Sequence, residues 1–318
     1  MKLLKFFVIA LSVACAASAH AWPERPVRII VPSAAGAAPD NMIRLIATRL
    51  ATELGQPVIV ENKVGAGGIV AKHAAELAKD DHTFLLTLTS TTTVAPLVFK
   101  AAADFNYLRD MQPVMTIGQS PFMIVAYPGN GTKSLGDLLQ MARTQPGAIP
   151  VATPPLSSIA QLSITVLSQM SGAKFNVIPF SRSSDSLTAV SSGDAAFLVD
   201  AVSAVLPFVR GQRVRPIAVL AATKLPGLEE FSLANETVPG FEISAGFGLV
   251  APKGVDRSIL NAMFLATSNV LKNPGLVRQL RDMAIFVHPA GPDAYRATLL
   301  NEADLWEKVI RAANIVPQ

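Results

Sequence analysis

Cysteine is almost absent from this sequence, which contains a single one, Cys15, among its 318 residues. If Cys15 is removed with an N-terminal leader, the remaining chain has neither a disulfide nor a thiolate metal site. A chain without cysteine suits an oxidising compartment, where a stray thiol would be oxidised.

The sequence also lacks the motifs of common enzyme sites. It has no G-x-S-x-G, no G-x-x-x-x-G-K-[ST] and no H-E-x-x-H. The histidines after the leader, His73, His82 and His288, are far apart and follow no metal-ligand spacing. The glycine-rich turn 65–68 has Val70 where a dinucleotide site needs its third glycine. We therefore expect no enzyme, no cofactor and no metal.

The sequence also has little excess of either positive or negative charge. The chain has 27 Lys and Arg against 23 Asp and Glu, a net charge of +4, and no run of basic residues. We therefore do not expect the protein to bind nucleic acid. The small positive charge predicts only a mild attraction for an anionic solute. After the N-terminal region no apolar run reaches transmembrane length without polar residues or proline, so we expect a soluble chain.

Residues 1–21 have the pattern of an export signal. Lys2 and Lys5 precede the apolar run Phe6–Ala17, and an A-x-A site ends at Ala21. We predict cleavage after Ala21 and a periplasmic protein. Removing 21 of 318 residues leaves 297, enough for two lobes, with a net charge of +2. The alternatives are an N-terminal membrane anchor and a lipoprotein acylated at Cys15.

The segment 27–68 is the most informative part of the chain. Val27–Val31 has the apolar character of a buried strand, and the spacing of apolar residues predicts a helix over 40–54 with Asp40 as its N-cap. A second strand is expected at 57–61. The loop before the helix consists of small residues, so it leaves backbone N–H groups at the helix start uncovered. Such a start favours a bound anion.

Apolar runs of strand length alternate with helical patterns along the rest of the chain. This alternation predicts α/β architecture with parallel sheets flanked by helices. Crossings near 119–123 and 240–244 predict one lobe from 22–120 plus 241–318 and another from 121–240; a single continuous sheet is the alternative. Further strands are expected at 84–89, 114–118, 123–126, 151–153, 177–180, 196–199, 216–221, 243–251 and 285–288, and further helices at 70–79, 134–145, 158–171, 184–192, 202–210, 256–271, 274–282 and 292–313.

Hydroxyl-rich loops follow four of the predicted strands. In open α/β sheets ligands bind beyond the carboxyl ends of the strands, and hydroxyls and amides can hold a carboxylate without a fixed cation. Ordinary turns and caps are the alternative for each loop. The predicted ligand-binding residues are Ser33, Ala34, Gly36 and Ala37 as backbone donors, Asp40 as loop organiser, Ser90, Thr91 and Thr92 as hydroxyl contacts, and Thr153, Ser157, Ser158, Gln161 and Ser181 in the opposite lobe.

Two charged residues in this set have an open role. Arg182 either clamps a second carboxylate of the ligand or is a solvated charge at the rim. Asp200, at the end of a predicted strand, either meets an amine or hydroxyl of the ligand or caps the helix at 202–210.

Several stretches resemble one known family. The chain reads W-P-x-x-P-V-R-I-I-V-P from Trp22, then G-x-x-x-D from Gly36, then L-G-Q-P-V-I-V-E-N-K-x-G-A-G-G from Leu54. Similar agreement follows at 142–147, 178–180, 192–194 and 248–254. Nearly all of 22–318 resembles the solute receptors of tripartite tricarboxylate transporters, also called the Bug family.

The resemblance implies a two-lobed type II periplasmic binding protein (a Venus flytrap) with mixed, mostly parallel sheets flanked by helices. It implies a carboxylate ligand, held by the first loop and by the loop matching 153–161, and docking on an inner-membrane transporter. This sequence departs from the family pattern at Ser33, Ala35 and Ala37, at 154–155, where two prolines stand, and at 181–182. We expect a monomer that binds a small organic acid. The rivals are a periplasmic sensor for a membrane kinase and an exported α/β hydrolase.

Overall fold

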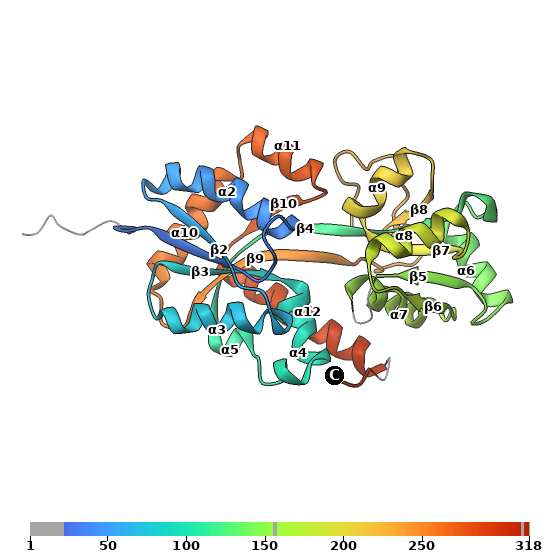
Figure 1. The fold of residues 1–318 in the computed structure, drawn as a ribbon, viewed down its shortest axis with the longest axis horizontal. Coiled ribbons are helices and arrows are strands. Elements are labelled where there is room, and N and C mark those ends of the chain that lie inside the picture. Colours follow the sequence, from blue (N-terminus) through green and yellow to red (C-terminus); the bar gives the residue numbers. More distant parts are fainter. Residues whose placement is uncertain (1–21, 155–157, 313–314, 318) are drawn as a thin grey trace, which may run out of the picture.

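A computed structural model describes residues 22–154, 158–312 and 315–317, which form two α/β lobes joined end to end (Figure 1). The predicted leader with Cys15, and the predicted ligand residue Ser157, lie outside the described residues. Among the helices that are described, none combines the length and the apolar character needed to cross a membrane.

The first lobe is built on a mixed sheet with strand order β2-β1-β3-β9-β4, and β10 pairs with β4. Its parallel part is β2-β1-β3, and β9 is antiparallel to both β3 and β4. The strands are β1 (Val27–Val31), β2 (Val58–Asn62), β3 (Thr83–Leu88), β4 (Met111–Ala126), β9 (Ser244–Pro252) and β10 (Phe286–Ala290), and the helices are α2 (Ala38–Leu54), α3 (Ile69–Ala78), α4 (Ala95–Val98), α5 (Tyr107–Asp110), α10 (Arg257–Val270) and α11 (Pro274–Asp282).

The second lobe is built on the far half of β4. This half pairs antiparallel with β7 and β8, and β7, β5 and β6 are parallel neighbours. The strands are β5 (Pro150–Thr153), β6 (Asn176–Pro179), β7 (Phe197–Ala201) and β8 (Arg215–Val219), and the helices are α6 (Leu135–Thr144), α7 (Ile159–Ser171), α8 (Ser183–Ser192) and α9 (Val202–Arg210). The sheets are mixed as predicted, but with more antiparallel pairing than the sequence predicted, because β4 and β9 connect the lobes in opposite directions.

Strand β4 is shared by the two lobes. The sequence predicted two strands here, and the structure has one strand of 16 residues. Its residues 111–121 pair with β9, and its residues 122–126 pair with β7. Hydrogen bonding therefore joins ten described strands into one sheet although the lobes are distinct: eight form a continuous path, and β8 and β10 each pair with β4 beside it. The predicted lobe boundaries near 120 and 240 stay a prediction.

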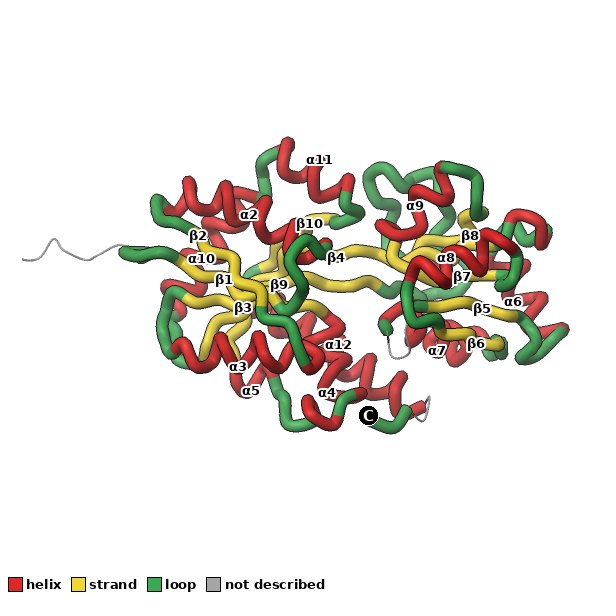
Figure 2. The backbone as a smooth tube through the Cα atoms, in the orientation of Figure 1, coloured by secondary structure: helices red, strands yellow, loops and turns green. Residues whose placement is uncertain are grey.

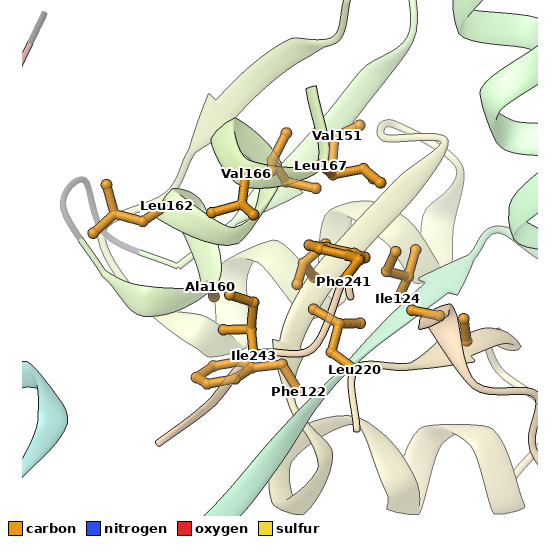
Figure 3. Close-up of a cluster of buried hydrophobic side chains, with 14 of the residues drawn as sticks. Phe122, Ile124, Val151, Ala160, Leu162, Val166, Leu167, Leu220, Phe241 and Ile243 are labelled. Carbon is orange, nitrogen blue, oxygen red and sulfur yellow. The ribbon is translucent and has the colours of Figure 1, made fainter. Parts of the chain in front are cut away.

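The last helix, α12 (Pro292–Ala312), packs against both lobes. Tyr295 and Leu299 belong to an apolar cluster of the first lobe together with Ile30 and Leu85. About two to three turns later, Trp306, Val309 and Ile310 belong to the apolar cluster of the second lobe. Figure 3 shows part of that cluster, in which Phe122 and Ile124 of β4 lie among side chains such as Phe241 and Leu220.

The sequence predicted the start of a helix correctly where a capping side chain is present. The predicted capping box of Ser134 and Asp137 at the start of α6 is confirmed. The prediction that Asp40 is the N-cap of α2 is wrong, because the helix begins at Ala38 and its N-cap is Ala37, which leaves Asp40 in the first turn.

The hydroxyl-rich segment after β3 is helical and not an extended loop, since Ser90–Val94 forms a helical turn with π-type hydrogen bonds.

Candidate functional site

The carboxyl ends of the parallel strands in each lobe point toward the other lobe. Strand β4 runs from the first lobe into the second, β9 is antiparallel to β4, and β3 is antiparallel to β9, so β3, β1 and β2 end toward the second lobe. Strand β7 is antiparallel to β4, so β7, β5 and β6 end toward the first lobe. The loops that carry the predicted site residues therefore face each other between the lobes (Figure 2).

Asp40 organises the first loop. Its buried carboxylate accepts hydrogen bonds from the Gly36 N–H (2.8 Å), the Asn62 side-chain amide (2.8 Å) and the Arg44 guanidinium (2.9 Å). Burial by itself raises the pKa of Asp40, but the hydrogen bonds from Arg44, Gly36 and Asn62 outweigh it and hold the pKa below its usual value. The predicted role of Asp40 as loop organiser agrees with these contacts.

The same contacts change the list of free donors in the first loop. The Gly36 N–H is used by Asp40, and the Ala37 N–H donates to the Ala34 carbonyl (3.2 Å). The prediction that these two amides are free is therefore wrong for this structure. Ser33 is different, because its Oγ is buried and has no hydrogen-bond partner in the described part of the chain.

Asn62 was missed by the sequence reasoning. It ends β2, and its side-chain amide donates both to Asp40 and to the Ser33 carbonyl (2.9 Å), so it ties the second strand to the first loop. A signal was available, because Asn62 lies within the E-N-K stretch that carries the family resemblance. Its position at a strand end of the same sheet edge also qualified it.

Two of the three predicted hydroxyl residues after β3 donate hydrogen bonds to the backbone. Thr91 and Thr92 both donate to the Leu88 carbonyl, at 3.0 and 2.9 Å, because the chain turns into a helix at this point. Their oxygens can still accept hydrogen bonds, and contact of the two hydroxyls with a ligand stays a prediction. Ser90, the third predicted residue of this loop, is exposed.

In the second lobe, Thr153 and Ser158 flank a loop before α7. The side chain of Thr153 at the end of β5 is fully buried, and its Oγ1 has no hydrogen-bond partner among the residues that the structure describes. Ser158 is the N-cap of α7, and its Oγ accepts from the Gln161 N–H (3.2 Å). The N–H groups of Ile159 and Ala160 have no carbonyl partner within the helix, as at any helix start.

Asp200 is buried at the end of β7 and holds the start of α8. Its carboxylate accepts from the Ser183 hydroxyl and from the Ala201 N–H (2.7 Å). Burial raises the pKa of Asp200, and the two hydrogen bonds oppose the shift without cancelling it. The alternative that Asp200 caps the helix at 202–210 is wrong, since the N-cap of α9 is Ala201 and no side chain caps it. Contact with a ligand stays a prediction.

Ser181 and Arg182 are exposed in the loop between β6 and α8. Arg182 is the N-cap residue of α8 by its backbone, and its side chain makes no capping hydrogen bond. The loop follows the carboxyl end of β6, so both residues lie at the edge of the second lobe that faces the first. Both roles considered for Arg182, ligand clamp and solvated rim charge, remain open.

One group of potential metal ligands lies elsewhere. Glu24, Asp81 and His82 bring their ligand atoms within 4.8 Å of one another. The His82 Nδ1 lies 2.5 Å from Asp81 and its Nε2 lies 3.4 Å from Glu24, so the two carboxylates meet different ring nitrogens. The group precedes β3, at the opposite edge of the sheet from the facing loops. It has no part in the candidate site.

Comparisons with known proteins agree with this geometry. A family model described as "Tripartite tricarboxylate transporter family receptor" matches residues 42–315. The chain is 29% identical to Protein BugT of Bordetella pertussis over 315 residues, which cover 98% of this chain and 96% of BugT.

Two solved structures of similar proteins carry a named ligand. The structure of Rpa4515 of R. palustris with adipate superposes with a TM-score of 0.76 at 27% identity, covering 94% of this chain and all of that one. MatC of Rhodopseudomonas palustris with bound malate gives a TM-score of 0.71 at 26% identity, covering 91% of this chain and all of that one.

Proposed function

The chain belongs to the tripartite tricarboxylate transporter receptor family, and from this premise we propose that it binds a small carboxylate between its two lobes. It is a solute-binding receptor and not an enzyme. Adipate and malate, the ligands named for two similar structures, are both dicarboxylates. The observation that carries the proposal is that the parallel strands of the two lobes end toward each other, with the hydroxyl residue Ser33 just after β1 and Thr153 at the end of β5.

The available interactions have sufficient strength. A helix N-terminus such as that of α7 stabilises an anion by about 0.3–1 kcal/mol, and by about 2 kcal/mol when partly buried. Each hydrogen bond to a charged group contributes about 1.5–3 kcal/mol. Micromolar affinity needs about 8 kcal/mol in total. A few donors from each lobe therefore suffice after the cost of association.

Closure of the lobes follows from this arrangement. A ligand that touches both lobes only when they are shut shifts the population toward the closed form. The closed form then docks on the inner-membrane subunits of the transporter. We place the protein in the periplasm as a monomer, exported by a leader that is cleaved after Ala21.

A thermal-shift panel of mono-, di- and tricarboxylates tests the function. We expect a rise in Tm for at least one acid, adipate and malate being the first two to try, and titration calorimetry should then give a one-to-one complex. Matched amides and alcohols should leave Tm unchanged, because they lack the anion. If no carboxylate raises Tm at millimolar concentration, the proposal is wrong.

Arg182→Ala tests the clamp. If the guanidinium of Arg182 meets a second carboxylate, the variant loses about tenfold or more in affinity for a dicarboxylate and little for the matching monocarboxylate. Calorimetry with adipate and hexanoate provides this comparison. Arg210→Ala, at the far end of α9, is the control and should leave both affinities unchanged. Equal losses for the two acids, or no loss, would make Arg182 a rim charge.

A further inference from the structure

Glu302 lies on α12 at the point where this helix passes between the lobes. It is one turn after Leu299, in the cluster of the first lobe, and one turn before Trp306, in the cluster of the second. No sequence pattern singles it out, because a glutamate in a helix of charged residues is ordinarily solvated.

Two cavities meet at Glu302. A cavity of about 40 Å³ lies on the side of the first lobe and is lined by residues such as Thr89, Thr116 and Gly246. The second, of about 250 Å³, is lined by both lobes, with Gln119 and Ser244 on the crossing strands and the segment 220–222 after β8. Movement of one lobe against the other therefore changes the surroundings of this side chain.

The carboxylate contacts the loop after β3, which is part of the candidate site. Thr89 donates to Glu302 Oε1 (3.2 Å), and Thr93 lies 3.4 Å from Oε2. Thr89 Oγ1 also accepts from the N–H of Gly246 on β9 (2.8 Å). One hydroxyl thus connects the last helix, the strand that crosses between the lobes and the first residue of the threonine-rich loop.

Among the residues that the structure describes, none forms an ion pair with Glu302 or brings a lysine or arginine into the two cavities beside it. Its carboxylate accepts hydrogen bonds from the two threonines, and the other ionisable groups lining the two cavities are Glu242 before β9, His288 on β10 and Tyr295 on α12. The threonine-rich loop, β4 and the segment 220–222 also line these cavities. Their described lining residues include no ionisable side chain. Burial raises the pKa of Glu302 to about 7, and the hydrogen bonds from Thr89 and Thr93 oppose this only in part.

We propose that Glu302 is a positioning residue for ligand binding, which acts through Thr89 and Thr93 on the site loop and couples movement of the lobes to gain or loss of a proton. Because both lobes line the larger cavity, closure changes the water around the carboxyl and hence its proton occupancy near neutral pH. The inference rests on the proposed function, since it needs a ligand that closes the lobes.

Calorimetry with adipate or malate at pH 7, in buffers of different ionisation enthalpy, tests the coupling. Wild type should exchange a fraction of a proton on binding, and its affinity should change between pH 6 and 8. Glu302→Gln should bind with no proton exchange and a flat pH profile over this range. Glu307→Gln, an exposed glutamate on the same helix, is the matched control and should behave as wild type.

The unliganded protein provides a second measurement. Because the folded-state pKa of Glu302 lies above its usual value of 4.5, the protonated form contributes stability at low pH that is lost as pH rises toward 8. The difference in unfolding free energy between wild type and Glu302→Gln should change in that direction from pH 5 to 8. A pH-independent difference, or adipate binding with no proton exchange in wild type, would overturn the inference. If no carboxylate binds at all, the proposed function fails first and this inference falls with it.

Discussion

Replacing Asp40 by alanine is expected to abolish carboxylate binding and to lower the free energy of unfolding by about 2–3 kcal/mol. The Asp40 carboxylate is 1% exposed and accepts from three donors. Without it, the Gly36 N–H loses its acceptor, the Asn62 amide keeps only the Ser33 carbonyl, and the first loop loses its shape. The Arg44 side chain is half exposed and can hydrogen-bond to water instead. Its ion pair with Asp40 therefore contributes little to the loss of stability. Urea denaturation and calorimetry with adipate measure the two effects.

Asp40→Asn separates charge from shape. The amide oxygen can still accept from Gly36, so this variant should retain the loop better than the alanine variant and lose less stability. Because the folded-state pKa of Asp40 is below its usual value, the stability it contributes is present at neutral pH and is lost as pH falls below about 4. The gap between wild type and Asp40→Asn should therefore shrink in acid.

A first-turn aspartate with no such contacts serves as the control for Asp40. Asp293 lies in the first turn of α12 and is 82% exposed in an ion pair with Arg257. Asp293→Ala should cost no more than about 1 kcal/mol. If Asp40→Ala and Asp293→Ala lose equal stability and both still bind adipate, the role assigned to Asp40 is wrong.

Trp306→Ala is expected to lower the free energy of unfolding by about 3–5 kcal/mol. Trp306 is 1% exposed and fixes the last helix in the apolar cluster of the second lobe, with Val309 and Ile310. Truncation leaves a cavity in this cluster and loosens the only part of α12 that lies there. Chemical denaturation followed by circular dichroism measures the loss.

Two further variants define the origin of the loss at Trp306. The indole N–H has no hydrogen-bond partner within the described residues, so Trp306→Phe removes ring volume and no hydrogen bond; it should cost less than the alanine variant. Leu300→Ala, half exposed on the same helix, should cost about 1 kcal/mol or less. Equal losses for Trp306→Ala and Leu300→Ala would show that Trp306 does not anchor the helix.

Local pattern was sufficient for most helices and strands. The spacing of Ile43, Ile46 and Leu50 predicted α2, and all three side chains are buried. Ser134 and Asp137 predicted the start of α6. Such features act over one or two turns, so neighbouring residues determine them.

The candidate site was predicted by location better than by contact. The strands β1, β3, β5 and β6 do end at the facing edges of the two lobes, because parallel neighbours end at the same edge of a sheet and β4 and β9 run between the lobes. The donors within them were not predictable, since hydrogen bonds such as Gly36 to Asp40 and Thr91 to Leu88 depend on how each loop turns. Contact of the predicted site residues with a ligand stays a prediction.

The sequence by itself determined the class of fold, the family and the absence of enzyme motifs, because periodicity and short motifs are properties of adjacent residues. Only the tertiary structure decided that β4 serves both lobes, that Asn62 connects the first loop to β2 and that Glu302, half-buried, has no basic partner among the described residues. These features join residues far apart in the chain. Their burial and hydrogen bonding depend on packing that no local pattern encodes.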